Sequence, residues 1–273
     1  MVGVLYIVAT PIGNLEDITL RALRVLKEVA CIAAEDTRHT QKLLSHYDIR
    51  TPLTSYHEHN ERAKAGQLVE RIKQGQNIAL VSDAGMPTIA DPGYRIVVAA
   101  IGAGIQVIPV PGPSALTAVL SASGLPTDRF IFEGFLPAKK KERRDRLEAL
   151  RGERRTLVCF EAPHRLRESL GDIREFLGER EVVLAREVSK IHEEFLRGTV
   201  GDVIDRLAGQ ELRGEMTLVV RGSAGESAVA EDQLKADIRR LKQEGMRVKE
   251  IAELLGERYG YSKKEIYRLA LEQ

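Results

Sequence analysis

The chain has 273 residues, a formal net charge of +1 and an apolar fraction of 43%. This length allows two domains and an appendage, and the composition is that of a globular protein, which excludes disordered and fibrous classes. No apolar run approaches the roughly 18 residues of a membrane span, and the first ten residues lack a basic leader, so a cytoplasmic protein without membrane contact is expected. Cys31 and Cys159 lie in apolar runs and are expected to be buried free thiols.

The first 110 residues alternate short apolar runs with amphipathic stretches. Strands are expected at 4–9, 31–34, 78–81 and 105–110, and helices at 20–29, 37–47, 60–73 and 94–101. Such alternation is typical of a mostly parallel sheet covered by helices. Three prolines between residues 109 and 113 then end the pattern, because proline cannot continue a helix or a central strand.

The second half has more strand patterns and fewer helices. A helix is expected at 114–123, and strands at 130–132, 156–160, 182–185, 194–199 and 216–220. These features predict an α/β fold with two α/β domains, an N-terminal one at 1–112 and a C-terminal one with a mixed sheet at 113–222.

A small, polar segment at 222–230 is expected to be a linker to a helical, helix-turn-helix-like tail at 231–273. Within the tail, Gly256 and Gly260 allow a turn, and Ser262 with Glu265 would cap the second helix. The tail carries nearly balanced charge, so a packing or dimerisation role is as well supported as nucleic-acid binding.

Residues 81–93, V-S-D-A-G-M-P-T-I-A-D-P-G, form the most informative segment. They follow a buried strand pattern and combine glycines and prolines with Asp83 and Asp91. A loop of this composition buries little surface, and open α/β sheets bind ligands at the carboxyl ends of their strands. We therefore expect a ligand-binding loop, with a plain turn as the alternative.

Residues 139–155 contain nine Lys or Arg against four acidic residues. A solvated helix face explains such a run, and a surface that binds a polyanion explains it more specifically. On the second interpretation, Arg143, Arg144 and Arg146 would face RNA, and His164 and Arg165 would grip a phosphate beside a helix start.

The first loop lacks the glycine spacing of a dinucleotide fold. Instead, six segments resemble the tetrapyrrole methylase class of S-adenosylmethionine enzymes, and within it the branch that methylates a cytidine ribose (2′-O) of bacterial 16S ribosomal RNA. They are A-T-P-I-G-N-L-E-D-I-T (9–19), A-E-D-T-R-H-T (34–40), S-Y-H-E-H-N-E (55–61), S-D-A-G-M-P-T-I-A-D-P-G (82–93), P-V-P-G-P-S-A (109–115) and F-E-A-P-H-R (160–165). One departure is Met86, where the family is expected to carry Thr.

The resemblance implies a cleft between the two domains that holds S-adenosyl-L-methionine. It also implies a homodimer and, as substrate, 16S ribosomal RNA within the small ribosomal subunit. The residues it assigns to the cofactor are Pro11, Ile12, Asp83, Met86, Ser114, Ala115, Phe160 and Met216.

Methyl transfer to a ribose hydroxyl benefits from a positioned base. Two polar clusters offer candidates, and we expect Glu35, Arg38, His57 and His59 to face the acceptor ribose. Which group is the base stays open. A metal bound by His57 and His59 lacks further ligands at a recognisable spacing, and hydrogen bonding by Asn60 and Glu61 at a helix start is the structural alternative.

Two other functions stay open. One is methylation of a corrinoid or porphyrin precursor, which would not require the basic stretch or the tail. The other is a non-catalytic RNA-binding factor that keeps an empty cleft.

Overall fold

The computed structural model describes the backbone of residues 1–223, 225–259 and 263–272, and the side chains of residues 1–223, 233–256 and 266–270. The chain forms two compact units. The first comprises Met1–Leu150 and Arg155–Arg221, and the second comprises Arg151–Arg154 and Gly222–Gln273. Because residues 1–221 lie almost entirely in one unit, the boundary at residues 112 and 113 stays a prediction.

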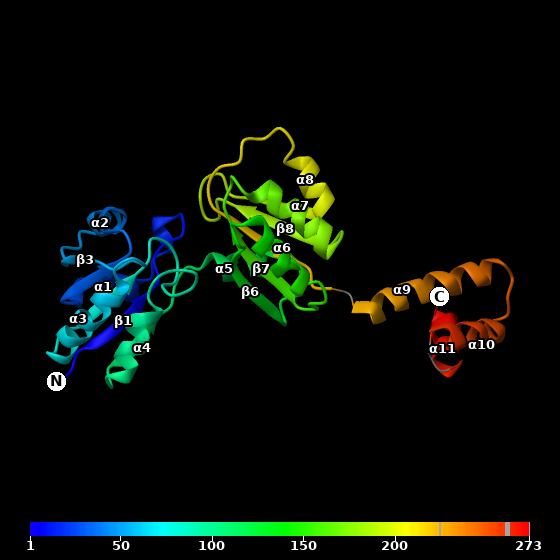
Figure 1. Ribbon diagram of the computed structural model, residues 1–273, viewed down its shortest axis with the longest axis horizontal. Coiled ribbons are helices and arrows are strands. Elements are labelled where there is room, and N and C mark those ends of the chain that lie inside the picture. Colours follow the sequence, from blue (N-terminus) through cyan, green and yellow to red (C-terminus); the bar gives the residue numbers. More distant parts are fainter. Residues whose placement is uncertain (224, 260–262, 273) are drawn as a thin grey trace. The chain divides into compact units, whose positions relative to one another are not determined.

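The first sheet is entirely parallel, as the alternating pattern predicts. Its strands are β1 (Val4–Val8), β2 (Cys31–Ala34), β3 (Leu53–Ser55), β4 (Ile78–Val81) and β5 (Gln106–Val110), in the order β3-β2-β4-β1-β5. Figure 1 labels β1 and β3 of this sheet. All carboxyl ends therefore lie at one edge. Pro109 lies in β5, which is an edge strand of the sheet. An edge strand tolerates proline, which has no backbone N–H group to donate to a neighbouring strand.

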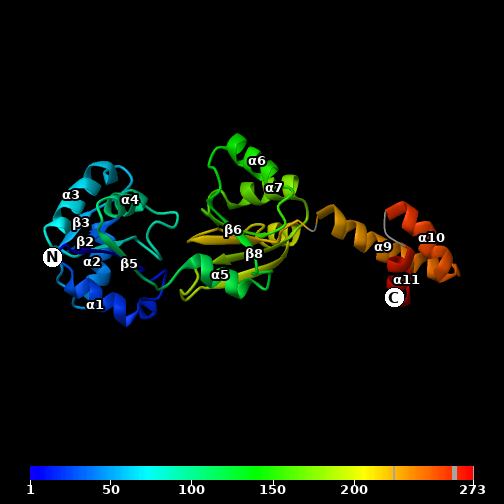
Figure 2. The ribbon, with the colours of Figure 1, turned by 90° about the horizontal axis from the view of Figure 1, so that it is seen from below.

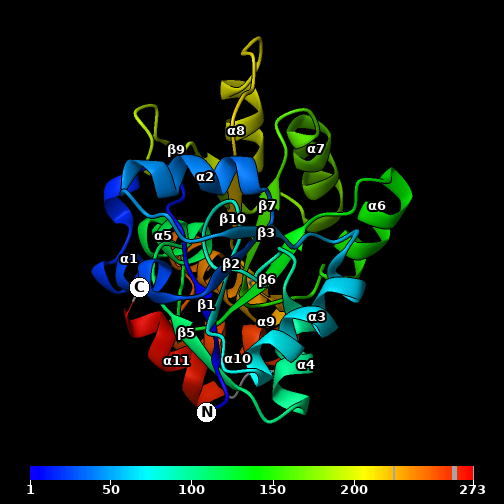
Figure 3. The ribbon, with the colours of Figure 1, turned by 90° about the vertical axis from the view of Figure 1, so that its left-hand side faces the viewer.

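Helices cover both faces of this sheet (Figures 2 and 3). They are α1 (Leu20–Glu28), α2 (Thr37–His46), α3 (Glu61–Lys73) and α4 (Tyr94–Gly102), with a short 3₁₀ turn at Leu15–Asp17. The apolar side chains of α1 and α2 pack on one face, and those of α3 and α4 on the other. Thr19 and Asp36 cap α1 and α2 through hydrogen bonds to backbone N–H groups, which fixes where each helix begins.

The second sheet is mixed, which confirms the predicted strand arrangement. Its strands are β6 (Phe130–Phe135), β7 (Thr156–Glu161), β8 (Glu181–Arg186), β9 (Glu194–Thr199) and β10 (Met216–Val220), in the order β6-β7-β10-β8-β9. Only the β6–β7 pairing in this sheet of the first unit is parallel. Helices α6 (Lys140–Ala149), α7 (Leu166–Leu177) and α8 (Val200–Arg206) cover one face, and α5 (Ala115–Ser123) covers the other (Figure 2). Cys31 and Cys159 are buried free thiols, as expected.

The expectation of fewer helices in the second half is wrong, because α5 to α8 equal α1 to α4 in number. The sequence patterns set no bounds for α6 and α7 and missed two further elements. Strand β3 has three half-buried residues, too few to show an alternation, and α8 has seven residues, fewer than two full turns. The predicted linker at 222–230 is wrong in part, because α9 begins at Gly225.

The second unit consists of three helices with their own apolar core. They are α9 (Gly225–Gln243), α10 (Val248–Tyr259) and α11 (Lys263–Glu272). Leu234, Ile251 and Ile266, one from each helix, are fully buried together. The predicted turn at Gly256 is wrong, because this residue lies within α10. Gly260, Ser262 and the side chain of Glu265 lie outside the described residues. Across the described chain, no helix is long and apolar enough to cross a bilayer.

The predicted RNA-facing role of Arg143 is wrong, because α6 buries this side chain, whereas the same role of Arg144 and Arg146, whose side chains are 33% and 48% exposed, stays a prediction. Arg143 is 1% exposed and pairs with Asp172 at 2.7 Å. Arg144 pairs with Asp172 at 3.3 Å, and Arg146 pairs with Glu133 at 2.7 Å. Reversing the charge of Arg143 would therefore test folding instead of RNA binding. The solvated-face interpretation fits Lys140 and Lys141, which are exposed.

Arg143→Met is expected to lower the free energy of unfolding by about 3 kcal/mol, because it leaves the buried Asp172 carboxylate short of a partner. Urea denaturation measures the change. Lys141→Met removes one positive charge from an exposed position of the same helix and should leave stability within about 0.5 kcal/mol. Equal stability of the two variants would contradict the structural role of Arg143.

Candidate functional site

A pocket of about 390 Å³ lies where loops from both sheets of the first unit meet, and we call it the strand-end pocket. From the first sheet it takes Glu35, which follows β2, and residues 83–86, which follow β4. From the second it takes Phe160 to Pro163 at the end of β7 and residues 214–217 at the start of β10. The carboxyl edge of a parallel sheet is where open α/β folds bind ligands.

The loops after β1 and β4 are tied together by their backbones. Thr10 N–H donates to the Gly85 carbonyl at 2.9 Å, and Gly85 N–H donates to the Thr10 carbonyl at 3.0 Å. The Thr10 hydroxyl donates to the Ser82 carbonyl at 3.1 Å. Gly85 has a φ of 78°, which favours glycine, so this residue type permits the pairing.

The loop after β4 holds a strained backbone. Thr88 and Ala90 have φ values of 77° and 64°, in the left-handed region that side chains with a Cβ rarely occupy. A Cβ at Gly93 would lie 2.8 Å from Leu80 Cδ2. Such strain persists where surrounding contacts hold it, and it is common at ligand-binding sites. This geometry supports the ligand-binding interpretation of residues 81–93 over a plain turn.

The sequence did not predict that the backbone at Gly214 lies against the side chain of Glu187. A Cβ at Gly214 would lie 1.9 Å from Glu187 Oε1, which accepts hydrogen bonds from Lys190 Nζ at 3.0 Å and from Glu215 N–H at 3.1 Å. The hydrogen bond from Lys190 lowers the pKa of Glu187. Gly214 thus lets the start of β10 reach the pocket, and the G-E-M run is the sequence signal that could have indicated it.

The strand-end pocket is acidic. Its lining includes Glu35, Asp83, Asp91, Glu161 and Glu215, and none of the described residues that line it is Lys, Arg or His. Two of the five carboxylates have cationic partners outside the lining, since Glu161 pairs with Arg165 at 2.7 Å and Glu215 pairs with Lys190 at 3.3 Å. The prediction that Arg165 binds a phosphate is therefore corrected, because its guanidinium is paired with Glu161.

Glu35, Asp83 and Asp91 form no ion pair with Lys or Arg within the described side chains. Asp83 Oδ1 accepts a hydrogen bond from Asp36 N–H at 3.0 Å, and Glu35 Oε2 accepts one from Asp83 N–H at 3.4 Å. Burial raises the pKa of Glu35, and repulsion from Asp83 adds to the effect. Burial also raises the pKa of Asp91 to about 6, with Glu35 and Asp83 adding repulsion. The three acids share one negatively charged region, and a bound cation would reduce the repulsion among them.

The structure brings most of the expected cofactor residues to this lining. Seven of the eight line it, namely Ile12, Asp83, Met86, Ser114, Ala115, Phe160 and Met216. Pro11 is half-buried beside Ile12 and is not part of the lining. The Phe160 ring is held edge-on by Phe132 and Phe135, with centroids 5.0 and 5.7 Å away. Their roles stay predictions.

Of the four residues expected at the acceptor, only Glu35 lines the pocket. The side chain of Arg38 is 89% exposed and binds back to Asp36, which caps α2 and whose pKa this contact lowers to about 2. His57 Nε2 lies 3.0 Å from Asn60 Nδ2, as in the structural alternative, and its buried Nδ1 has no partner among the described residues. His59 is exposed beside Glu58, 3.4 Å away.

His57 and His59 have ring centroids 5.9 Å apart. In the part of the chain that the structure describes, no group of three or more His, Cys, Asp or Glu could hold a metal ion. Local contacts with Asp36 and Asn60 thus hold Arg38 and His57 beside the starts of α2 and α3. A sequence pattern cannot show this, because it gives the order of polar groups and not their rotamers.

Comparison with known families decides the class. The family model of tetrapyrrole (corrin/porphyrin) methylases matches residues 4–204. The chain belongs to this family. As a tetrapyrrole methylase family member it is a methyltransferase, and the two-sheet α/β fold is the one expected.

Curated relatives extend over the whole chain. It is 51% identical to "Ribosomal RNA small subunit methyltransferase I" of Escherichia coli O157:H7, over 99% of this chain and 96% of the relative. It is 47% identical to the protein of the same name from a Synechocystis strain, over 99% and 98%.

Two solved structures share the fold. A uroporphyrin-III-C-methyltransferase from Thermus thermophilus has a TM-score of 0.58 at 25% identity, over 85% of this chain and 98% of that one. A diphthine synthase has a TM-score of 0.61 at 14% identity, over 80% and 90%, a likeness of fold alone.

Asp91→Asn is expected to stabilise this family member at neutral pH. With a folded-state pKa of about 6 against an ordinary value of 3.8, the stability that protonated Asp91 contributes is fully present below 3.8 and is lost as the pH rises through 6. The variant should raise Tm by about 2 °C at pH 7.5 and leave it unchanged at pH 3.5, measured by calorimetry.

Asp145→Asn, on the exposed face of α6, is the matched control and should not change Tm at either pH. A pH-independent effect of Asp91→Asn would refute the assignment of a raised pKa.

Proposed function

We propose that the protein transfers a methyl group from S-adenosyl-L-methionine to the 2′-hydroxyl of a cytidine in the 16S ribosomal RNA of the small ribosomal subunit. The observation that carries this proposal is the acidic strand-end pocket, in a methyltransferase about half identical to relatives named as ribosomal RNA small subunit methyltransferases. A substrate of this kind implies a cytoplasmic enzyme.

The lining fits this methyl donor chemically. The donor carries a sulfonium, an ammonium and a carboxylate group and is a cation overall, and the carboxylates of Glu35, Asp83 and Asp91 offer negative charge to its two cationic groups. Ile12, Phe160 and Met216 supply apolar contacts for a purine ring. Ser114 and Ala115, at the start of α5, supply polar backbone groups.

When bound, the donor supplies an electrophilic methyl group, so the protein's task is to orient the acceptor oxygen and to take up its proton. Glu35 is the best-placed base, because it lines the pocket and burial raises the pKa of its carboxyl group. Asp83 is a positioning residue in this proposal, because its side chain accepts from the N–H of Asp36 and so links the loops after β2 and β4. Arg38, His57 and His59 are proposed to contact the acceptor from outside the lining.

The test of the proposed function is incubation with methyl-labelled S-adenosylmethionine and 30S subunits from cells that lack the modification. Label in cytidine 2′-O-methyl of 16S RNA is expected. Label only in an added uroporphyrinogen or precorrin would support the tetrapyrrole alternative. RNA binding without donor binding in calorimetry would support a non-catalytic factor.

Glu35→Gln is expected to lower kcat at least about 100-fold, because removal of a general base has an effect of that size. Glu35→Gln should also weaken donor binding, because it removes one of the three carboxylates that offer negative charge to the donor, and Asp83→Ala should weaken it strongly. His57→Ala should slow turnover by about tenfold and spare donor binding, since its ring lies outside the lining. Single-turnover methylation and calorimetry measure these effects. A larger loss for His57→Ala than for Glu35→Gln would transfer the role of base to His57.

The proposal includes a homodimer. Helix α4 exposes Tyr94, Val98 and Ile101, at 73%, 48% and 63% exposure and at spacings that place them on one helix face. An apolar stripe of this kind supports contact with a second copy. Sedimentation equilibrium at the monomer mass of 30.3 kDa would contradict this part of the proposal.

A further inference from the structure

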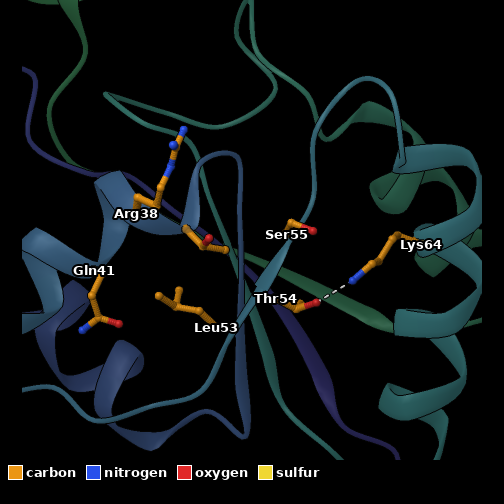
Figure 4. A pocket seen from close by; sticks show the side chains of 7 residues that line it. Arg38, Gln41, Leu53, Thr54, Ser55 and Lys64 are labelled. Atoms are coloured by element: carbon orange, nitrogen blue, oxygen red, sulfur yellow. Dashed lines mark hydrogen bonds between the residues drawn. The ribbon is translucent and has the colours of Figure 1, made fainter.

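A second hollow, of about 580 Å³, lies over β3, and we call it the β3 groove. Six of its seven lining residues are polar, and it shares none of them with the strand-end pocket. Figure 4 shows Arg38, from α2, and Lys64, from α3, on opposite sides of β3, with Thr54 and Ser55 between them. The described lining contains no acidic residue, so its charge is opposite to that of the strand-end pocket.

Lys64 is the central cation of the β3 groove. Its Nζ donates to Thr54 Oγ1 at 2.7 Å (Figure 4), and no carboxylate among the described side chains pairs with it. In contrast, Lys73 on the same helix pairs with Glu70 at 2.7 Å. An ammonium group has three N–H donors, so the bond to Thr54 leaves further donors for an anion.

Arg38 adds a second cation. Asp36 accepts from its Nε at 3.2 Å and from its Nη2 at 2.9 Å, so this acid holds one side of the guanidinium. Nη1 has no hydrogen bond within residues 1–223 and keeps its donors. The hydroxyl groups of Thr54 and Ser55 and the Gln41 amide surround the groove with neutral polar groups. This set of donors suits the oxygens of a phosphate diester.

The strand order fixes how far the β3 groove lies from the strand-end pocket. Ser55 ends β3, Glu35 follows β2 and Asp83 follows β4, and these three parallel strands are consecutive neighbours. Neighbouring strands are about 4.8 Å apart, so the strand ends at Ser55 and Val81 are separated by about 10 Å. A chain that presents a ribose at Glu35 therefore passes its adjoining phosphates within reach of the groove.

Electrostatics gives the reason for two separate sites. The carboxylates of Glu35, Asp83 and Asp91 that suit a cationic donor repel the phosphates of a polyanion. An RNA substrate must consequently be held by cations outside that pocket. The β3 groove provides them at the same edge of the sheet.

We propose that the β3 groove binds a backbone phosphate of the RNA strand next to the target nucleotide, with Lys64 as its principal contact. This inference rests on the proposed function, because it assumes an RNA acceptor. A phosphate contact of this kind positions the strand without reading its sequence.

The test compares Lys64→Met with Lys73→Met, which removes the same charge from the other end of α3. Binding of a single-stranded polycytidylate oligonucleotide and of unmodified 30S subunits is measured by filter binding over a range of salt concentrations. Lys64→Met should raise Kd and the KM for subunits about threefold to fivefold. It should also lower the slope of log K against log salt by about 0.7 for the oligonucleotide. The kcat and the donor affinity should not change.

Two further variants separate charge from packing. Thr54→Val removes the hydroxyl that accepts from Lys64 and keeps the ammonium group, so RNA affinity should stay within twofold. Lys64→Arg should restore most of the affinity. If Thr54→Val reproduces the loss, Lys64 acts through local structure and the inference fails.

Each outcome distinguishes the inference from the function it rests on. If the wild-type protein methylates 30S subunits while Lys64→Met and Lys73→Met bind RNA equally, the β3 groove is not the phosphate site and the proposed function stands. If Lys64→Met weakens RNA binding while the wild type transfers no label, the phosphate site stands and the proposed function fails. Absence of RNA binding by the wild type overturns both.

Discussion

Mutual repulsion among Glu35, Asp83 and Asp91 is the constraint on which the site depends. These carboxylates face one pocket, and none of them pairs with a Lys or Arg among the described side chains. Burying these carboxyl groups costs free energy, and repulsion between them adds to the cost, which is why the pKa values of Glu35 and Asp91 rise. A cationic ligand removes that cost, so the same arrangement that destabilises the free protein strengthens binding of a positively charged donor.

The fold supplies the means of holding these groups in place. Parallel pairing brings the ends of β2 and β4 to one edge of the sheet, and the reciprocal backbone bonds of Thr10 and Gly85 join the loops of that edge. The second sheet completes the enclosure through Phe160 and the close approach at Gly214. Side chains on different strands can then act on one ligand without depending on the flexibility of a single loop.

The sequence allowed the fold to be predicted in large part, because the buried strands β1, β2 and β4 are long enough to show their apolar pattern. It failed for β3 and α8, which are too short for periodicity to be visible. In the site, apolar and backbone contributors such as Ile12 and Met216 were identified through resemblance, and they line the pocket. Arg38 and Arg143 show what sequence alone cannot give, since a nearby Asp36 or a distant Asp172 decides where each guanidinium points.

The left-handed backbone at Thr88 and Ala90 has a consequence for how the protein can be altered. Glycine at either position would relieve the steric cost of the Cβ and would also let the segment sample other shapes in the absence of ligand. Thermal stability and a loop pre-organised for ligand binding are therefore opposed requirements at these two positions. Selection for a more stable enzyme and selection for a more active enzyme would favour different residues at Thr88 and Ala90.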